Sequence, residues 1–187
     1  MGTPFRYNGV VEDIYDIRYF VNVHSLAAYS FESCSGLKNV TIPISIKTVG
    51  SHLFRNSGII SCIIPEEGIT ALSNFMFVSC AKLAAVQIPE GVTTIGEQCF
   101  RRASPAANAL LEISYPSTVT SFGAEVHLYN GLQSFTIKAV NPPTLASARM
   151  FNYGRQPAIY VPAESIEAYK AAEYWSSYKN YIRAIPE

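Results

Sequence analysis

The sequence predicts an α/β solenoid of stacked repeats, each about 23 residues long, and three observations lead to this fold class. Phenylalanine recurs at a constant spacing, each phenylalanine is followed by a short apolar strand that ends at or near a proline, and a second apolar pair follows that proline. The phenylalanine column consists of Phe31, Phe54, Phe77 and Phe100. A unit of this size cannot bury its own apolar face, so successive units must stack, with their strands in one parallel sheet.

The four clearest copies of the strand alternate inward apolar residues with outward residues. They occupy residues 37–43, 59–65, 83–89 and 110–116. The apolar pair after the proline usually leads to a glycine, at Gly50, Gly96 and Gly123, and Ser73 with Asn74 takes that place in the second copy. Glycine at this point fits either a turn with positive φ or a close approach of two backbones.

Degenerate copies extend the array in both directions. Upstream, Ile14, Ile17 and Tyr19 fit the strand positions. Downstream, residues 132–137 form another strand, and His127 occupies the phenylalanine column. We therefore expect one domain over residues 1–187, with a solenoid over 8–140 and a C-terminal cap over 141–187.

The cap contains a strand at residues 158–162 and a helix candidate at 165–175. Ile166, Tyr169, Ala172 and Trp175 recur at helical spacing, so the helix can lay an apolar face on the last repeat. An alternative is that the tyrosines between Tyr153 and Tyr181 line a carbohydrate site together with Trp175, because aromatic rings present flat apolar faces with a polar tip.

These repeats resemble a known family. The run Phe-x-x-Cys-x-x-Leu-x-x-Val-x-Ile-Pro at residues 31–43 and the run Ile-Pro-x-x-Val-Thr-x-Ile-Gly at 88–96 are similar to BspA-like leucine-rich repeats. The resemblance covers residues 14–140 and implies a right-handed leucine-rich-repeat solenoid. It also implies a bacterial cell-surface or secreted protein that serves adhesion or protein recognition without catalysis. The segment after residue 141 resembles the one that closes many bacterial proteins of this type.

The chain departs from the family pattern in three places: a one-residue deletion after Phe54, an insertion at residues 104–109, and decay of the copy at His127. Just ahead of the insertion stand Arg101 and Arg102. A solvated turn is the favoured interpretation of this pair, because surface loops accept length changes at little cost. A contact for an acidic partner is the alternative.

Composition narrows the functional classes. The 14 Lys and Arg residues balance the 14 Asp and Glu residues, which argues against nucleic acid or an anionic membrane as partner. No apolar stretch approaches the roughly 20 residues of a transmembrane helix. The N-terminus shows no export signal, so the expected cell-surface or secreted location comes from the family resemblance alone.

No group of residues in the sequence suggests a catalytic or metal-binding site. The three histidines fall in different columns of the repeat, and the only aspartates, Asp13 and Asp16, lie at the N-terminus. We therefore expect no catalytic residues, no metal site and no cofactor. The four cysteines also scatter over the register at core positions, so we expect free, packed thiols.

The expected binding surface is the outward face of the strands, and its partner is expected to be a protein, such as a host or extracellular protein. Alternation places the outward side chains in two columns along the sheet. The candidate binding residues in these columns are Arg18, Asn39, Thr41, Ser61, Ile63, Gln87, Glu112 and Ser114. The competing interpretation is a merely solvated face, with any contact in the loop 104–109 or in the aromatic cap.

Overall fold

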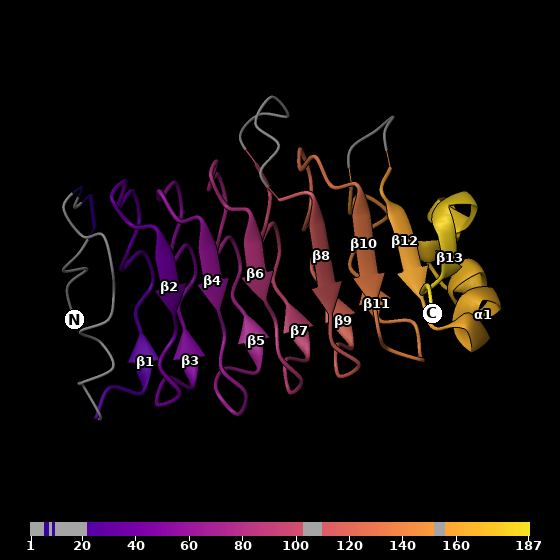
Figure 1. Ribbon diagram of the computed structural model, residues 1–187, viewed down its shortest axis with the longest axis horizontal. Helices are drawn as coiled ribbons and strands as arrows, with labels where there is room; N and C mark the ends of the chain where they lie inside the picture. The colour runs from indigo at the N-terminus through magenta and orange to yellow at the C-terminus, as the bar shows by residue number, and fades with distance from the viewer. Residues whose placement is uncertain (1–5, 8, 10–21, 103–109, 152–155) are drawn as a thin grey trace.

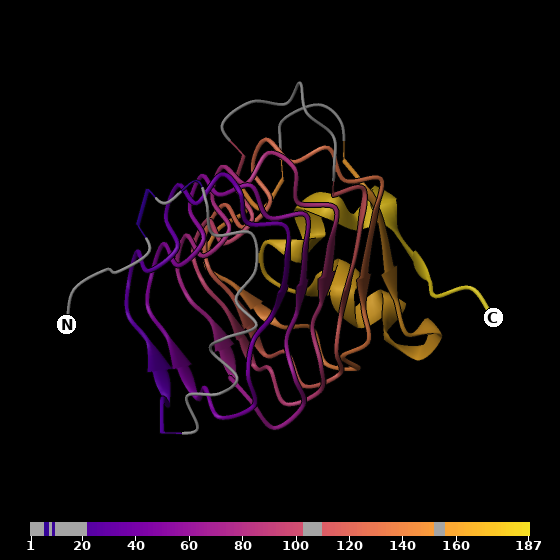
Figure 2. The same cartoon turned by 60° about the vertical axis from the view of Figure 1, so that its left-hand side comes forward.

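The chain winds into a parallel β-solenoid of about six turns with about 23 residues per turn. The computed structural model describes residues 6–7, 9, 22–102, 110–151 and 156–187. Figures 1 and 2 show two rows of strands along the same long axis, with the helical segment gathered at the C-terminal end. The predicted solenoid and its C-terminal helix are confirmed. The division into residues 8–140 and 141–187 stays a prediction.

The first row of strands carries the longer segments that precede each proline. These are β2 (Asn39–Thr41), β4 (Ser61–Ile63), β6 (Ala85–Gln87), β8 (Glu112–Tyr115), β10 (Ser134–Ile137), β12 (Ala158–Val161) and β13 (Ile182–Ala184). Neighbouring strands pair in parallel, as between Val40, Cys62 and Val86. The apolar residue at each centre points inward, so one side of this row packs on the core.

The second row is built from the apolar pairs after the prolines. Its two-residue strands are β1 (Ser25–Leu26), β3 (Thr48–Val49), β5 (Ala71–Leu72), β7 (Thr94–Ile95), β9 (Ser121–Phe122) and β11 (Thr144–Leu145). In the close-packed part of this row, Leu72, Ile95 and Phe122 are buried and stand in register. From β2 to β11 each turn therefore contributes one strand to each row, and the core lies between the rows.

The expectation of one sheet needs correction. The first row divides into β2-β4-β6 and β13-β12-β10-β8, and the second into β1-β3 and β11-β9-β7-β5. The break in the first row falls in the repeat that carries the insertion. The insertion lengthens the connection between Phe100 and β8, and no pairing joins β6 to β8. The second row stays paired from β7 to β9 across the same repeat, so the solenoid continues through it.

The phenylalanine column forms a continuous stack inside the solenoid, as predicted. Centroid distances are 5.6 Å from Phe31 to Phe54, 5.5 Å from Phe54 to Phe77 and 5.3 Å from Phe77 to Phe100. His127 follows Phe100 at 5.2 Å and is itself stacked on Phe151 at 5.9 Å. All six side chains are buried. We call this stack the inner ladder.

The structure shows which of the two reasons for glycine after the second row applies, a turn with positive φ or a close approach of two backbones. Among the described glycines only Gly91 has a positive φ. A Cβ on Gly50 would lie 2.2 Å from the Ala28 backbone nitrogen, and one on Gly96 would lie 2.5 Å from that of Asn74. Glycine is therefore required by the close approach of successive turns. In the copy without glycine, the Ser73 hydroxyl donates to the Gly50 carbonyl over 2.8 Å.

The cap helix is shorter than expected. The chain forms a 3-10 turn (Ala163–Ser165), the helix α1 (Ile166–Ala171) and a 3-10 helix (Trp175–Tyr181) before β13. The expected helix to Trp175 is wrong beyond Ala171, because Ala172 is extended and Tyr174 has φ 62°. The tight turn lets Trp175 point into the core, where its indole N–H donates to the Pro143 carbonyl over 2.6 Å.

Candidate recognition surfaces

The structure brings most of the predicted binding residues together on the outward side of the first row. In one column Asn39, Ser61 and Ala85 are paired across β2, β4 and β6, and in the other Thr41, Ile63 and Gln87 are paired. Ser61 is half-buried, whereas Asn39, Thr41, Ile63, Gln87, Glu112 and Ser114 are exposed. Arg18 lies outside the described residues.

This surface, which we call the sheet face, crosses the break in the first row. Glu112 and Ser114 belong to β8 and continue the two columns in register with β10, not with β6. On the N-terminal side, the Ser61 hydroxyl donates to the Asn39 amide oxygen over 2.7 Å. Ile63 is 43% exposed between Thr41 and Gln87. The sheet face is thus a small polar surface with one large apolar side chain, that of Ile63.

Three rings of the aromatic cap are closed to a sugar, whereas Tyr174 is 37% exposed. Trp175, Tyr169 and Tyr178 are buried, and the Tyr169 hydroxyl donates to the Ala139 carbonyl over 2.8 Å. Burial raises the pKa of the Tyr169 hydroxyl. The proposal that Trp175 lines a sugar site is therefore wrong, because a stacking platform needs an open ring face. Tyr153 lies outside the described residues.

The buried histidine and cysteine side chains are part of the packed core. His127 accepts or donates one hydrogen bond with the Tyr115 hydroxyl over 2.8 Å, and desolvation by burial lowers its pKa to about 3. All four cysteines are free and buried, as predicted. Burial raises the pKa of Cys80 to about 11, which disfavours the reactive thiolate. Among the described residues, no group of His, Cys, Asp and Glu side chains could hold a metal ion.

A second surface, missed by the sequence analysis, runs along the turns. Tyr29, His52 and Phe75 stand two residues before successive rings of the inner ladder, and each has a φ near +60°. This left-handed conformation turns their side chains outward. His52 is stacked on Tyr29 and on Phe75, with centroid distances of 4.6 Å in both pairs. We call these three the outer ladder; the repeat spacing was the signal that could have revealed it.

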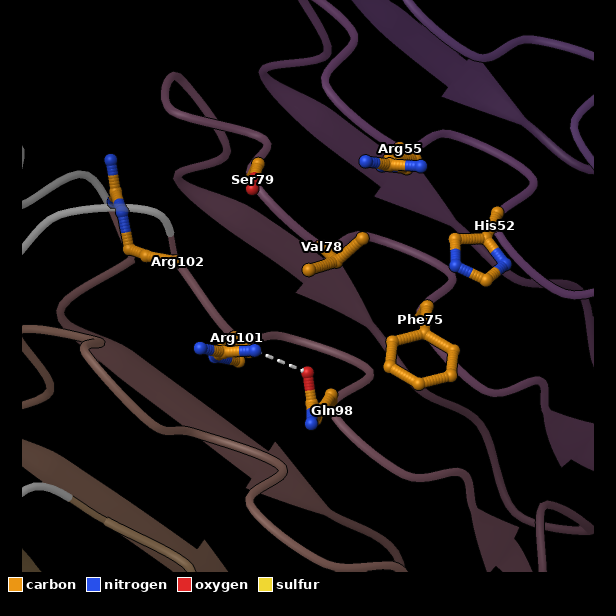
Figure 3. A pocket seen from close by; sticks show the side chains of 8 residues that line it. All are labelled: His52, Arg55, Phe75, Val78, Ser79, Gln98, Arg101 and Arg102. Atoms are coloured by element: carbon orange, nitrogen blue, oxygen red, sulfur yellow. Dashed lines mark hydrogen bonds between the residues drawn. The ribbon is translucent and has the colours of Figure 1, made fainter.

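Figure 3 shows the pocket beside the outer ladder, lined by His52, Arg55, Phe75, Val78, Ser79, Gln98, Arg101 and Arg102. Arg101 donates from Nη1 to the Gln98 amide oxygen over 2.7 Å. Arg102 donates from Nη2 to the Ala81 carbonyl over 2.6 Å and is only 5% exposed. The favoured interpretation of this arginine pair as a solvated turn is therefore wrong for Arg102. Desolvation by burial lowers the pKa of its guanidinium.

The parallel rows and the buried ring column define the class of protein: a leucine-rich-repeat solenoid. A family model described as the BspA type leucine rich repeat region matches residues 10–136 in six copies. The chain belongs to this family, as the sequence motifs indicated. Proteins of this kind are protein-interaction or surface-associated modules and typically non-enzymatic scaffolds.

One solved structure supports the same fold. The crystal structure of a leucine-rich repeat protein from Bacteroides ovatus is 20% identical, covers 88% of this chain and superposes with a TM-score of 0.55. The chain spans 43% of the length of that protein. The pneumococcal vaccine antigen PcpA is 17% identical over 87% of this chain and 58% of its own, with a TM-score of 0.35.

No curated protein matches the chain. Within the residues that the structure describes, none of the helices is long and apolar enough to pass through a membrane.

Proposed function

We propose that this chain is a non-enzymatic recognition module that binds a protein partner at a bacterial cell surface, with adhesion as its role. The observation that carries the proposal is the parallel register of the sheet face, which aligns outward side chains from β2, β4 and β6 in two columns. A regular array of short polar side chains offers hydrogen bonds along a flat surface, and solenoids use such extended surfaces for binding.

Ile63 is the expected anchor of the contact. It is 43% exposed, and its register partners Thr41 and Gln87 supply polar groups on either side. Interfaces derive most of their affinity from a few central side chains surrounded by polar contacts that exclude water. The arrangement of one apolar side chain among polar neighbours therefore supports a protein partner.

The location and the adhesive role rest on family membership. A cell-surface protein should be accessible to protease or antibody on intact cells of the source organism. Labelling of the chain on intact cells, with no labelling of a cytoplasmic marker, is the expected result. Labelling that appears only after lysis would contradict the location while leaving the sheet face as a separate question.

The sheet face is tested with a partner captured by cross-linking on the folded chain. We expect Ile63→Glu combined with Gln87→Glu to weaken its binding at least severalfold, because both substitutions bury unpaired charge in the interface. Ile44→Glu is the matched control, since Ile44 is 59% exposed but lies outside the strands of the face. Circular dichroism checks the fold of each variant. Full binding by the folded double variant would overturn the assignment of the sheet face.

A further inference from the structure

A groove runs along the turns at the side of the outer ladder. It consists of the pocket in Figure 3 and a second hollow lined by Arg6, Tyr7, Glu32, Ser33, Arg55, Asn56 and Ser79. The two hollows share Arg55 and Ser79, so they lie next to each other. We call this the turn groove. It follows the solenoid axis across several turns, which suits an extended chain more than a compact ligand.

The turn groove concentrates positive charge in a chain whose formal net charge is zero. Arg6, Arg55, Arg101 and Arg102 line it, whereas Glu32 is its one carboxylate among the described lining residues. Glu32 is buried and forms ion pairs with both Arg6 and Arg55. Among the described residues, Arg101 and Arg102 form no ion pair. The groove therefore carries a positive charge that no carboxylate in this part of the chain neutralises.

The Arg101 guanidinium is held in place before any ligand arrives. Gln98 binds Nη1 of Arg101, and the guanidinium lies over the Tyr129 ring with its central carbon 5.6 Å from the centroid. The Nε of Arg101 is buried without a hydrogen-bond partner, whereas the residue as a whole lines the pocket. A rigid guanidinium fork matches the two oxygens of a carboxylate. Fixing it in advance lowers the entropy cost of binding.

Two rings of the outer ladder, His52 and Phe75, line the turn groove beside the arginines. Both faces of His52 are stacked against neighbouring rings, and one face of Phe75 is stacked on His52. Ring edges carry the positive part of the aromatic quadrupole, which favours carboxylate oxygens. Desolvation by burial, assisted by the charge of Arg55, lowers the pKa of His52, so its imidazole is neutral at pH 7. The attraction for anions thus comes from the arginines.

We propose that the turn groove binds an extended acidic peptide segment of a partner protein, with Arg101 and Arg55 taking successive carboxylates. This site is separate from the sheet face and goes beyond the function proposed for it. An extended peptide advances about 3.3 Å per residue, so glutamates a few residues apart reach Arg55 and Arg101, which stand two turns apart. Charge complementarity and the length of the groove favour a peptide.

The test uses fluorescence anisotropy with a labelled peptide of alternating Glu and Gly, measured in low salt. We expect the Glu peptide to bind and a matched Gln and Gly peptide not to bind. Binding should weaken as salt rises to 0.5 M, because exposed ion pairs are screened. Failure of the Glu peptide to bind, or equal binding of the Gln peptide, would overturn the proposal.

Variants locate the site. Arg55→Gln with Arg101→Gln should lower the affinity at least tenfold, about 1.4 kcal/mol, since both substitutions remove charge-assisted hydrogen bonds to the peptide. Arg183→Gln is the control, because Arg183 is exposed on β13 outside the groove. If the double variant melts early, Arg55→Gln alone serves, since that side chain is 48% exposed. Unchanged affinity in the folded groove variant would refute the site.

Two competitors decide the chemical class. An oligomer of galacturonate carries the same carboxylates on sugar rings, and a single-stranded oligonucleotide carries phosphates. We expect each to compete at least tenfold less effectively than unlabelled Glu peptide. Stronger competition by the galacturonate oligomer would overturn the peptide in favour of an acidic glycan. Stronger competition by the oligonucleotide would overturn it in favour of nucleic acid.

Discussion

The inner and outer ladders are separated by two residues in each repeat, yet they obey different rules. The inner ladder is a run of six buried rings from Phe31 to Phe151. The outer ladder has three half-buried rings, and Gln98 takes the following position of its column, again with a positive φ. Both columns lie on the same repeating backbone, so the two ladders differ only in the access of solvent to their side chains. Exclusion of water requires an apolar side chain, or a hydrogen-bonded polar one such as His127, at every inner position, whereas the outer column accepts polar side chains.

The largest effect is expected in the inner ladder. Phe77→Ala should lower the free energy of unfolding by about 3 to 5 kcal/mol, because it removes a buried ring and leaves a cavity between two stacked neighbours. Urea denaturation followed by circular dichroism measures the loss. A loss below about 1 kcal/mol would show that this ring contributes no more than a surface side chain.

The polar member of the inner ladder should make stability depend on pH. His127 is neutral when folded, with a pKa of about 3, and titrates near 6.5 when unfolded. The unfolded state therefore binds more protons between these values. His127 should cost about 1.4 kcal/mol of stability per pH unit as pH falls below 6.5, and nothing above it.

The control for this pH dependence replaces the buried pair by rings. His127→Phe with Tyr115→Phe removes both partners of the hydrogen bond at similar shape. Denaturation at pH 7 and pH 5 should show a smaller loss on acidification in this variant than in the parent chain. Equal losses in the two proteins would assign the pH dependence to other groups.

The outer ladder supplies the matched comparison on the same turn. Phe75→Ala should cost about 1 to 1.5 kcal/mol, since its ring is half-buried and has one stacked partner in His52. The same denaturation measurement serves both phenylalanines. If Phe75→Ala proved as destabilising as Phe77→Ala, the outer ladder would be part of the core and the division between the two ladders would fail.

The smallest expected effect concerns the cysteines beside the inner ladder. All four thiols are free and buried, and Cys99 directly precedes Phe100. We expect alkylating reagent to leave the folded chain unmodified over hours and to add four labels in denaturant, because buried thiols ionise poorly. Intact mass measures the labels. Rapid labelling without denaturant would mean that the inner ladder opens locally.

The sequence predicts those features of the fold that rest on contacts repeated in every turn, and it misses those that rest on a single contact between distant segments. The inner ladder, the strands and the two columns of the sheet face follow from the repeat, because a residue one period later meets the same surroundings. The cap departs from this rule. The regular spacing from Ile166 to Trp175 suggested one helix, but the chain turns at Tyr174 so that Trp175 reaches the Pro143 carbonyl. That contact joins segments that no local pattern connects.

Periodicity and hydrophobicity are enough to predict the solenoid, its period, the packing of its cysteines and the alternation that places Ile63 outward. The folded chain was needed to show where the sheets break, why glycine follows the second row, and that Arg102 is buried beside Arg101 and the outer ladder. These features depend on distances between backbones of neighbouring turns and on access of water to each side chain. Both quantities exist only once the turns are stacked.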